Sequence, residues 1–253
     1  MLILLPPSEG KTRPDQGEPL DLDSLSSPSL NPTREQILRS LVRLSQTKRG
    51  AEILGLGPTQ AEHLERNAAL PSEPTAPASE VYTGVLFGEL GLATLDADAR
   101  ARAEERLAVA SALFGLVRPG DRIPAYKLSG ATTLPRLGTV ASRWKPVMGR
   151  AVAELAGDGL VLDLRSGTYA QFGHAEGLPR ASVRVLTETN GVRKVVSHFN
   201  KATKGQLVRA LLVEGATPDS VDELVEVWSD LGWTVEVPDT APGKPIQLDI
   251  VTT

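Results

Sequence analysis

The pattern of apolar and polar positions predicts a strand at the start of the chain and a hairpin late in it. Residues Leu2–Leu5 form a continuous apolar run, which is typical of a buried strand. Two β-rich runs, Val183–Thr187 and Val192–Ser197, flank Asn190-Gly191. Because an Asn-Gly pair suits the positive φ angles of a type I′ turn, these runs are expected to pair as a β-hairpin.

Helical spacing of apolar residues follows this hairpin, at Leu207, Ala210 and Leu211. A helix at Arg34–Ser45 is expected to be capped by Asn31 or Thr33. The same reasoning predicts further helices from Asp96 or Asp98 to Leu113, from Arg143 to Ala156 and over 218–231, and further strands at 160–164, 233–237 and 246–251. Residues 13–31 and 70–79 are rich in Pro and Ser and are expected to be irregular.

Composition narrows the classes of site that the chain can contain. The 253 residues suffice for one large domain or two small ones, and the formal net charge of −4 argues against a general polyanion binder without excluding a local basic cleft. Cysteine is absent and the three histidines have no ligand spacing, so we expect no metal site and no cofactor. No signal peptide or membrane span is apparent, which favours a cytoplasmic protein.

Basic residues gather where the hairpin leads into the next helix: Arg193, Lys194, Lys201 and Lys204. A helix N-terminus carries unpaired N–H groups and the positive end of the helix dipole. Lysines there oppose helix formation but favour a bound anion, so the cluster indicates either an anion site or a solvated basic face.

A second basic segment precedes a glycine-rich turn. Lys48 and Arg49 lead into Gly55-Leu56-Gly57, then a proline at the start of a new helix, then Thr59. This order is typical of a helix-hairpin-helix element, whose glycines let the backbone approach a DNA phosphate. A plain helix–helix turn has the same pattern, and the acidic residues nearby offset the basic pair.

Polar and aromatic residues follow several expected strands, where open α/β sheets place ligands. We predict that Lys11, Lys127, Lys201 and Lys204 converge on one concavity. Asp163 is interpreted first as a structural acid paired with Arg165 and otherwise as a proton carrier. The other residues expected at this cleft are Tyr82, Arg118 (which could pair with Asp121), Tyr126, Ser166, Tyr169 and Ser197. Gly10-Lys11-Thr12 lacks the spacing of a Walker phosphate loop.

Several stretches, in order along the chain, resemble the YaaA-type peroxide-stress protein family. The matching residues are MLILL-P with Lys11-Thr12, Val81–Gly84, Leu113–Asp121, Tyr126–Leu128, Trp144, Ser166-x-x-Tyr169 and Ser197-x-x-x-Lys201-x-x-Lys204-Gly205. The family often has SPAKT near Lys11 and Arg at position 204, so the first loop and the phosphate geometry there are expected to differ.

This resemblance implies a single compact mixed α/β domain over residues 1–253, with a helix-hairpin-helix insert at about 34–68. It also implies a basic cleft that binds duplex or distorted DNA and a cytoplasmic role in protection from peroxide. We expect a monomer that binds DNA without sequence preference, with Tyr82 and Tyr126 available to stack on an unpaired base. An enzyme acting on a small anionic or nucleotide-like substrate in the same cleft is the alternative.

Overall fold

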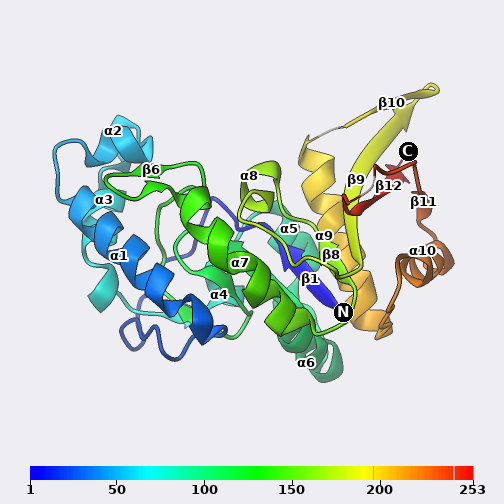
Figure 1. Ribbon diagram of the computed structural model, residues 1–253, viewed down its shortest axis with the longest axis horizontal. Helices are drawn as coiled ribbons and strands as arrows, with labels where there is room; N and C mark the ends of the chain where they lie inside the picture. The colour runs from blue at the N-terminus through cyan, green and yellow to red at the C-terminus, as the bar shows by residue number, and fades with distance from the viewer. Residues whose placement is uncertain (196, 242, 253) are drawn as a thin grey trace.

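The opening apolar run forms the central strand of a mixed sheet (Figure 1). The computed structural model describes residues 1–195, 197–241 and 243–252, without the side chains of residues 197–199. Strand β1 (Leu2–Leu5) is fully buried and pairs in parallel with β3 (Leu107–Ser111) on one side and β8 (Val161–Asp163) on the other. This confirms the buried strand predicted at the N-terminus.

The rest of the sheet extends from these three strands in both directions. Its order is β11-β12-β9-β8-β1-β3-β4, with β10 paired to β9 alone. Parallel pairing links β8, β9 and β12, whereas β4, β10 and β11 are antiparallel to their neighbours. The bounds of these strands are β4 (Gly115–Val117), β9 (Arg180–Thr189), β10 (Val192–Lys194), β11 (Thr234–Glu236) and β12 (Ile246–Thr252).

Helices cover the sheet and build the end of the molecule away from β9–β12 (Figure 1). Helices α1, α2 and α3 lie at that far end, whereas α10 packs beside β11. The helices of the described part are α1 (Asn31–Ser45), α2 (Gly50–Leu54), α3 (Glu62–Ala68), α4 (Ala78–Val81), α5 (Val85–Leu90), α6 (Ala97–Arg106), α7 (Val140–Ala156), α8 (Gly167–Ala170), α9 (Ser197–Glu214) and α10 (Val221–Asp230). Two small pairs, β2 (Ala76–Pro77) with β5 (Arg122–Ile123) and β6 (Thr133–Leu134) with β7 (Gly138–Thr139), complete the fold.

The predicted hairpin and its turn are confirmed, but its second strand is shorter than the expected run 192–197, because β10 ends at Lys194 and α9 begins at residue 197. Asn190 and Gly191 have φ angles of 52° and 74°, and they join β9 to β10. Helix α9 follows, with Leu207, Val208 and Leu211 buried against the core. A glycine in α9, Gly205, packs against α5 so closely that a Cβ atom there would collide with the carbonyl oxygen of Leu86.

Two helix boundaries differ from the prediction. Helix α1 begins at Asn31 and not after it, with a proline in its first turn, and the Asn31 side chain accepts a hydrogen bond from Arg34 instead of capping. Helix α7 begins at Val140, because Thr139 caps it by accepting a hydrogen bond from the Ser142 amide. Pro146, expected near the helix start, therefore lies inside the helix.

The prediction of a helix from Asp96 or Asp98 to Leu113 is wrong for its second half. Asp96 does cap α6, accepting a hydrogen bond from the Ala99 amide, but the helix ends at Arg106. Residues 107–111 instead form β3, in which every residue is buried. A parallel strand covered on both faces has no apolar–polar alternation, so its sequence resembles a continuing helix.

The segment expected to be a helix-hairpin-helix contains two short helices joined by a tight turn. Helix α2 has five residues and ends at Gly55 in the left-handed region, and α3 follows after a single 3₁₀ turn at Pro58–Gln60. This geometry suits a plain helix–helix connection as well as a DNA-binding hairpin. Within the described part of the chain, none of the helices combines the length and apolar character needed to cross a membrane.

Candidate functional site: a lysine-lined cleft

The candidate site lies at the carboxyl ends of β1 and β8. From β1 the chain first crosses to β3 on one side and later returns to β8 on the other, so the strand order reverses at β1. Open α/β sheets bind ligands at such a reversal because the loops after the two strands diverge and leave a crevice. Here those loops are residues 6–12 after β1 and 164–166 after β8.

A cavity of about 950 Å³ occupies this position, and four lysines from three separate segments line it. Lys11 comes from the loop after β1, Lys127 from the segment after β5, and Lys201 and Lys204 from the first turns of α9. Positions three apart in a helix share a face, which places Lys201 and Lys204 toward the same opening. The predicted convergence of these four lysines is confirmed.

The amine of Lys11 has a strongly lowered pKa. Burial, followed by the nearby charge of Lys127, lowers the pKa of Lys11 to about 7, and Glu9 partly opposes this. Its Nζ atom donates a hydrogen bond to the carbonyl oxygen of Ser8 at 2.9 Å. The same atom lies 4.4 Å from the ring centroid of Tyr126 and 5.5 Å from that of Tyr82. A substantial fraction of this amine is therefore neutral near pH 7.

Lys204 is partly buried, on the α9 side of the cleft. Burial lowers its pKa from the ordinary value, and the charge of Asp163 works in the opposite direction. Its Nζ atom lies 3.5 Å from the carbonyl oxygen of Leu164, which is long for a hydrogen bond. Lys201, one turn earlier, is exposed at the mouth of the cleft. The cleft thus combines a partly buried lysine with an exposed one on a single helix face.

Asp163 is the structural acid that we expected, because Arg165 satisfies both of its oxygens. Arg165 donates from Nε to Oδ1 at 2.8 Å and from Nη2 to Oδ2 at 2.6 Å, and its backbone amide donates to Oδ1. The Arg165 side chain is 1% exposed, yet the residue lines the cleft, and its Nη1 has no hydrogen-bond partner among the described residues. We therefore add Arg165 to the site.

The two tyrosines expected to stack on an unpaired base are buried instead. Tyr82 and Tyr126 are 2% and 4% exposed, and their hydroxyl oxygens lie 3.1 Å apart. The Tyr126 hydroxyl also lies 2.7 Å from Ser111 Oγ. Burial raises the pKa of both phenols, so they stay protonated. In this conformation neither ring is open to a base, and their faces support Lys11.

Of the three other polar residues predicted at the cleft, Ser166 and Tyr169 line it. Ser166 is exposed in the loop before α8, and Tyr169 is half-buried within that helix; both line the cavity. Burial raises the pKa of Tyr169 above its ordinary value. The side chain of Ser197 lies outside the described part of the structure.

Two arginines predicted to contribute to the site are held elsewhere by the fold. Arg118 donates to the carbonyl oxygens of Glu104 and Glu105 at the end of α6, and it does not line the cleft. Arg118 and Asp121 do pair across the turn, as expected, but the bond is made by the backbone amide of Arg118, which donates to Asp121 Oδ2 at 2.8 Å. Backbone acceptors at the end of a helix satisfy a guanidinium more fully than an open cleft would.

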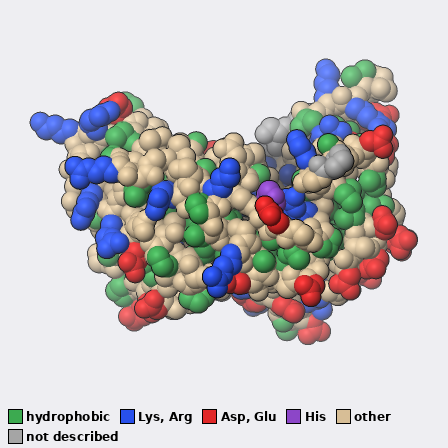
Figure 2. All heavy atoms as spheres, viewed as in Figure 1, with side chains coloured by type: hydrophobic (Ala, Val, Ile, Leu, Met, Phe, Trp, Pro, Cys, Tyr) green, Lys and Arg blue, Asp and Glu red, His purple; other side chains and the backbone are tan. Residues whose placement is uncertain are grey.

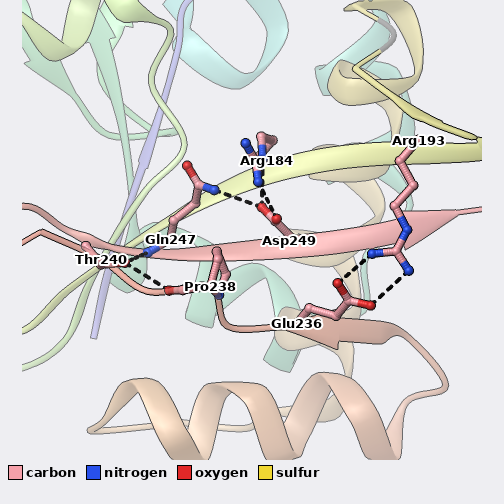
Figure 3. A network of polar contacts seen from close by, with 7 residues as sticks. All are labelled: Arg184, Arg193, Glu236, Pro238, Thr240, Gln247 and Asp249. Atoms are coloured by element: carbon pink, nitrogen blue, oxygen red, sulfur yellow. Dashed lines mark hydrogen bonds and ion pairs between the residues drawn. The ribbon is translucent and has the colours of Figure 1, made fainter.

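Arg193 is likewise neutralised, on the hairpin. It forms ion pairs with Glu188 at 2.6 Å and with Glu236 at 2.7 Å, and the second pair links β10 to β11 (Figure 3). Lys194, the next residue, is exposed at the end of β10. Neither residue lines the lysine cleft, so the basic cluster of the sequence separates into a hairpin part and a cleft part.

The glycine-rich turn borders the cleft, but its amides already have acceptors. Gly55 lines the cavity together with Leu54. The amides of Gly55 and Leu56 donate to carbonyls of α2, and the amide of Gly57 donates to Gln60 Oε1 at 3.0 Å. A phosphate at this turn would have to displace those bonds. Of the polar residues predicted nearby, Lys48 and Thr59 are exposed, and the exposed Arg49 pairs with Glu52 at 3.4 Å.

Sequence reasoning missed Arg165, Asn200 and the segment Thr83–Phe87, all of which line the cavity. Arg165 directly follows a strand end, so the same argument that selected Lys11 would have found it. Asn200 lies one residue before Lys201 in α9 and carries a buried Oδ1 with no partner among the described residues. Among residues 1–195, 197–241 and 243–252, His, Asp and Glu side chains form no group suited to a metal ion.

Fold and site together define a mixed α/β protein with a lysine-lined cleft at the carboxyl ends of its central parallel strands. A family model described as peroxide stress protein YaaA matches residues 1–237. The chain belongs to this family. It is 46% identical over 257 residues to a UPF0246 protein of Streptomyces coelicolor, covering 99% of this chain and 98% of the relative. A UPF0246 protein of Corynebacterium efficiens is 43% identical over 241 residues, covering 94% and 95% of the two chains.

Proposed function

We propose that this protein binds DNA through the phosphates that its lysine cleft can hold, and that it does so as part of the cytoplasmic response to peroxide. The observation that carries the proposal is the convergence of Lys11, Lys127, Lys201 and Lys204 on one cavity. Lysine presents a flexible point charge, which suits a phosphate group. Binding of this kind positions a nucleic acid without sequence preference.

The shape and charge of the surface support a large ligand. The molecule is hollowed between the end that carries α1–α3 and the end that carries the β9–β10 hairpin (Figure 2). Lys and Arg side chains lie on both sides of this hollow, whereas many Asp and Glu side chains lie along the edge of the molecule opposite to it. Such separation yields an attractive surface on a chain whose formal net charge is −4.

The turn at residues 55–57 enters the proposal in a smaller role than a helix-hairpin-helix would have. Its three amides donate within the fold, so the charge of the lysines is the main attraction for phosphate. Gly55 still borders the cavity, which makes the turn continuous with the lysines. A single copy of the chain contains all four lysines, and we propose that a monomer binds.

Fluorescence anisotropy with a labelled duplex of arbitrary sequence tests this function. We expect binding that weakens steeply with salt, is equal for unrelated sequences, and resists competition by mononucleotides. Absence of duplex binding at low salt would contradict the proposal.

One observation favours a second function, that of an enzyme acting on a small anionic or nucleotide-like substrate. Lys11 is an amine that is partly neutral near pH 7, in a cleft that also presents Ser166 and Tyr169. In the anisotropy experiment this function predicts tight binding of a mononucleotide and weak binding of the duplex.

A further inference from the structure

Lys11 lies between the lysine cleft and a second cavity. The second cavity has a volume of about 500 Å³ and shares Glu9, Gly10, Lys11 and Lys127 with the lysine cleft. Its remaining lining residues are Arg13, Gln60, Glu62, His63, Arg66 and Tyr126. A ligand held in the cleft can therefore place a reacting group at Lys11 and still find space beyond it.

The surroundings of the Lys11 amine suit a nucleophile. Among the described residues, Lys11 forms no ion pair with a carboxylate. The hydrogen bond that Nζ donates in the described structure goes to a backbone carbonyl, that of Ser8, and both an ammonium group and a neutral amine can donate it. Burial and Lys127 lower the pKa of Lys11 to about 7. Desolvation beside another cation is a known way to activate a lysine.

We propose that Lys11 is an amine nucleophile that forms a Schiff base with the aldehyde of a phosphate-bearing ligand in this cleft. The lone pair of neutral Nζ attacks the carbonyl carbon, giving a carbinolamine. Loss of one water molecule then forms the C=N bond, so that amine and aldehyde yield imine and water without any oxidant or reductant. Where the ligand is DNA, which rests on the proposed function, the aldehyde is the ring-opened deoxyribose of an abasic site.

The aromatic rings near Lys11 favour the product of the reaction. A protonated Schiff base is a cation at the position of the lysine nitrogen. The ring faces of Tyr126 and Tyr82, whose centroids lie 4.4 and 5.5 Å from Nζ, attract a cation there. The phenols remain neutral because burial raises their pKa. They therefore neither add a negative charge nor compete for the aldehyde.

Basic side chains lie on both sides of Lys11, and this is the reason for proposing a ligand that carries phosphate. Lys127 lines both cavities, while Lys201 and Lys204 line the cleft. On the other side, the side chain of Arg66 is 16% exposed; its Nη2 lies 3.9 Å from Glu62 Oε2, and its buried Nε has no hydrogen-bond partner among the described residues. A phosphate on either side of the aldehyde therefore meets a positive charge.

Borohydride trapping tests the proposal, because reduction makes a Schiff base permanent. The full-length protein is incubated with borohydride and a duplex containing one abasic site, or with glyceraldehyde 3-phosphate as a small probe. Denaturing gels detect the DNA adduct, and mass spectrometry locates either adduct on the chain. We expect the adduct on Lys11, and we expect Lys11→Arg to lower its yield by about tenfold or more, since a guanidinium does not form the imine.

Controls separate chemistry from binding. Lys244→Ala removes an exposed lysine outside both cavities and should leave trapping unchanged. Each variant is compared at a protein concentration that saturates the duplex. The trapping rate should rise with pH through about pH 7 as Lys11 loses its proton. The ionisable groups that face Lys11 are Glu9, His63, Lys127 and the two phenols, and His63→Gln should keep this rise.

The outcomes distinguish this inference from the proposed function. Duplex binding without an adduct from either probe overturns the inference and leaves DNA binding intact. An adduct on another lysine, unaffected by Lys11→Arg, also overturns it. An adduct with the small probe alone, in a protein that does not bind duplex, supports the Lys11 chemistry and contradicts the DNA function.

Discussion

Asp163, the last residue of β8, and Arg165, in the loop that follows, form an ion pair with Oδ2 and Nη2 only 2.6 Å apart. The pair fixes the loop whose next residues line the lysine cleft. A buried guanidinium whose partner is removed keeps its desolvation cost without compensation. We therefore expect the main role of Asp163 to be stabilisation of the fold.

Replacing Asp163 with Asn should therefore destabilise the fold, by about 3 kcal/mol in the free energy of unfolding. Urea denaturation followed by circular dichroism measures the change. The matched control is Glu35→Gln, which removes an exposed pair with Arg39 and should shift the midpoint far less. Equal effects of the two substitutions would show that the Asp163 pair is not buried in solution.

Lys11 should make stability rise with pH. Its folded pKa is about 7 and its ordinary value is 10.5, so between these values the unfolded chain binds more protons than the folded one. The free energy of unfolding therefore increases as the pH is raised from about 7 to about 10.5, by up to about 1.4 kcal/mol per pH unit. Below pH 7 Lys11 is charged in the folded protein as well, and the full cost of burying that charge opposes folding. Lys11→Met should stabilise the protein most below pH 7 and progressively less toward pH 10. Urea melts of both proteins at several pH values measure the difference, and a constant difference would refute the lowered pKa.

The two lysines of α9 should contribute charge and not sequence preference to DNA binding. Replacing Lys201 and Lys204 with Ala removes up to two phosphate contacts, so the slope of log affinity against log salt should shrink by about 0.9 per lost contact. Anisotropy titrations at several salt concentrations measure the slope, with Lys244→Ala as the control. A sequence preference that disappears with these lysines would mean that they contact bases.

The turn at residues 55–57 should respond differently from the lysines. Gly57 has a φ angle of −72°, and a Cβ atom there would meet only Gln60 Oε1 at 3.9 Å, so Gly57→Val should fold normally. If the turn touches the DNA backbone, this side chain blocks close approach, and affinity should fall while the salt slope stays nearly constant. Unchanged affinity would remove the turn from the interface and leave the lysines as the binding element.

The contact between α9 and α5 offers a test of the cleft wall. Gly205→Ala should destabilise the protein by about 2 kcal/mol, since the new methyl group meets the backbone of α5, which cannot yield as a side chain can. Gly88→Ala is the matched control on α5 itself, because no atom lies within 4 Å of its added Cβ. Higher helix propensity should make that control slightly more stable. Thermal melts of both variants provide the comparison, and a stable Gly205→Ala protein would mean that the two helices separate easily.

The sequence by itself determined the elements whose signals are local. The apolar run at residues 2–5, the positive φ angles of Asn190 and Gly191, and the acid cap at Asp96 all follow from neighbouring residues. The convergence of the four lysines was predicted from their positions after expected strands. Of the four, only Lys11 comes from a loop that directly follows a central strand, since Lys127 follows β5 of a separate two-stranded sheet and the other two lie in α9.

Tertiary structure alone decided the features that depend on distant partners. Strand β3 exists because β1 and β4 pair with it, although its sequence continues the pattern of α6. Contacts between distant segments bury Tyr82 and Tyr126. Ion pairs with two glutamates hold Arg193 on the hairpin, away from the cleft. The lowered pKa of Lys11 likewise arises from packing and from Lys127, which is far away in sequence. Charge and propensity are properties of a residue, whereas solvent exclusion and pairing are properties of its surroundings, and only the folded chain supplies those.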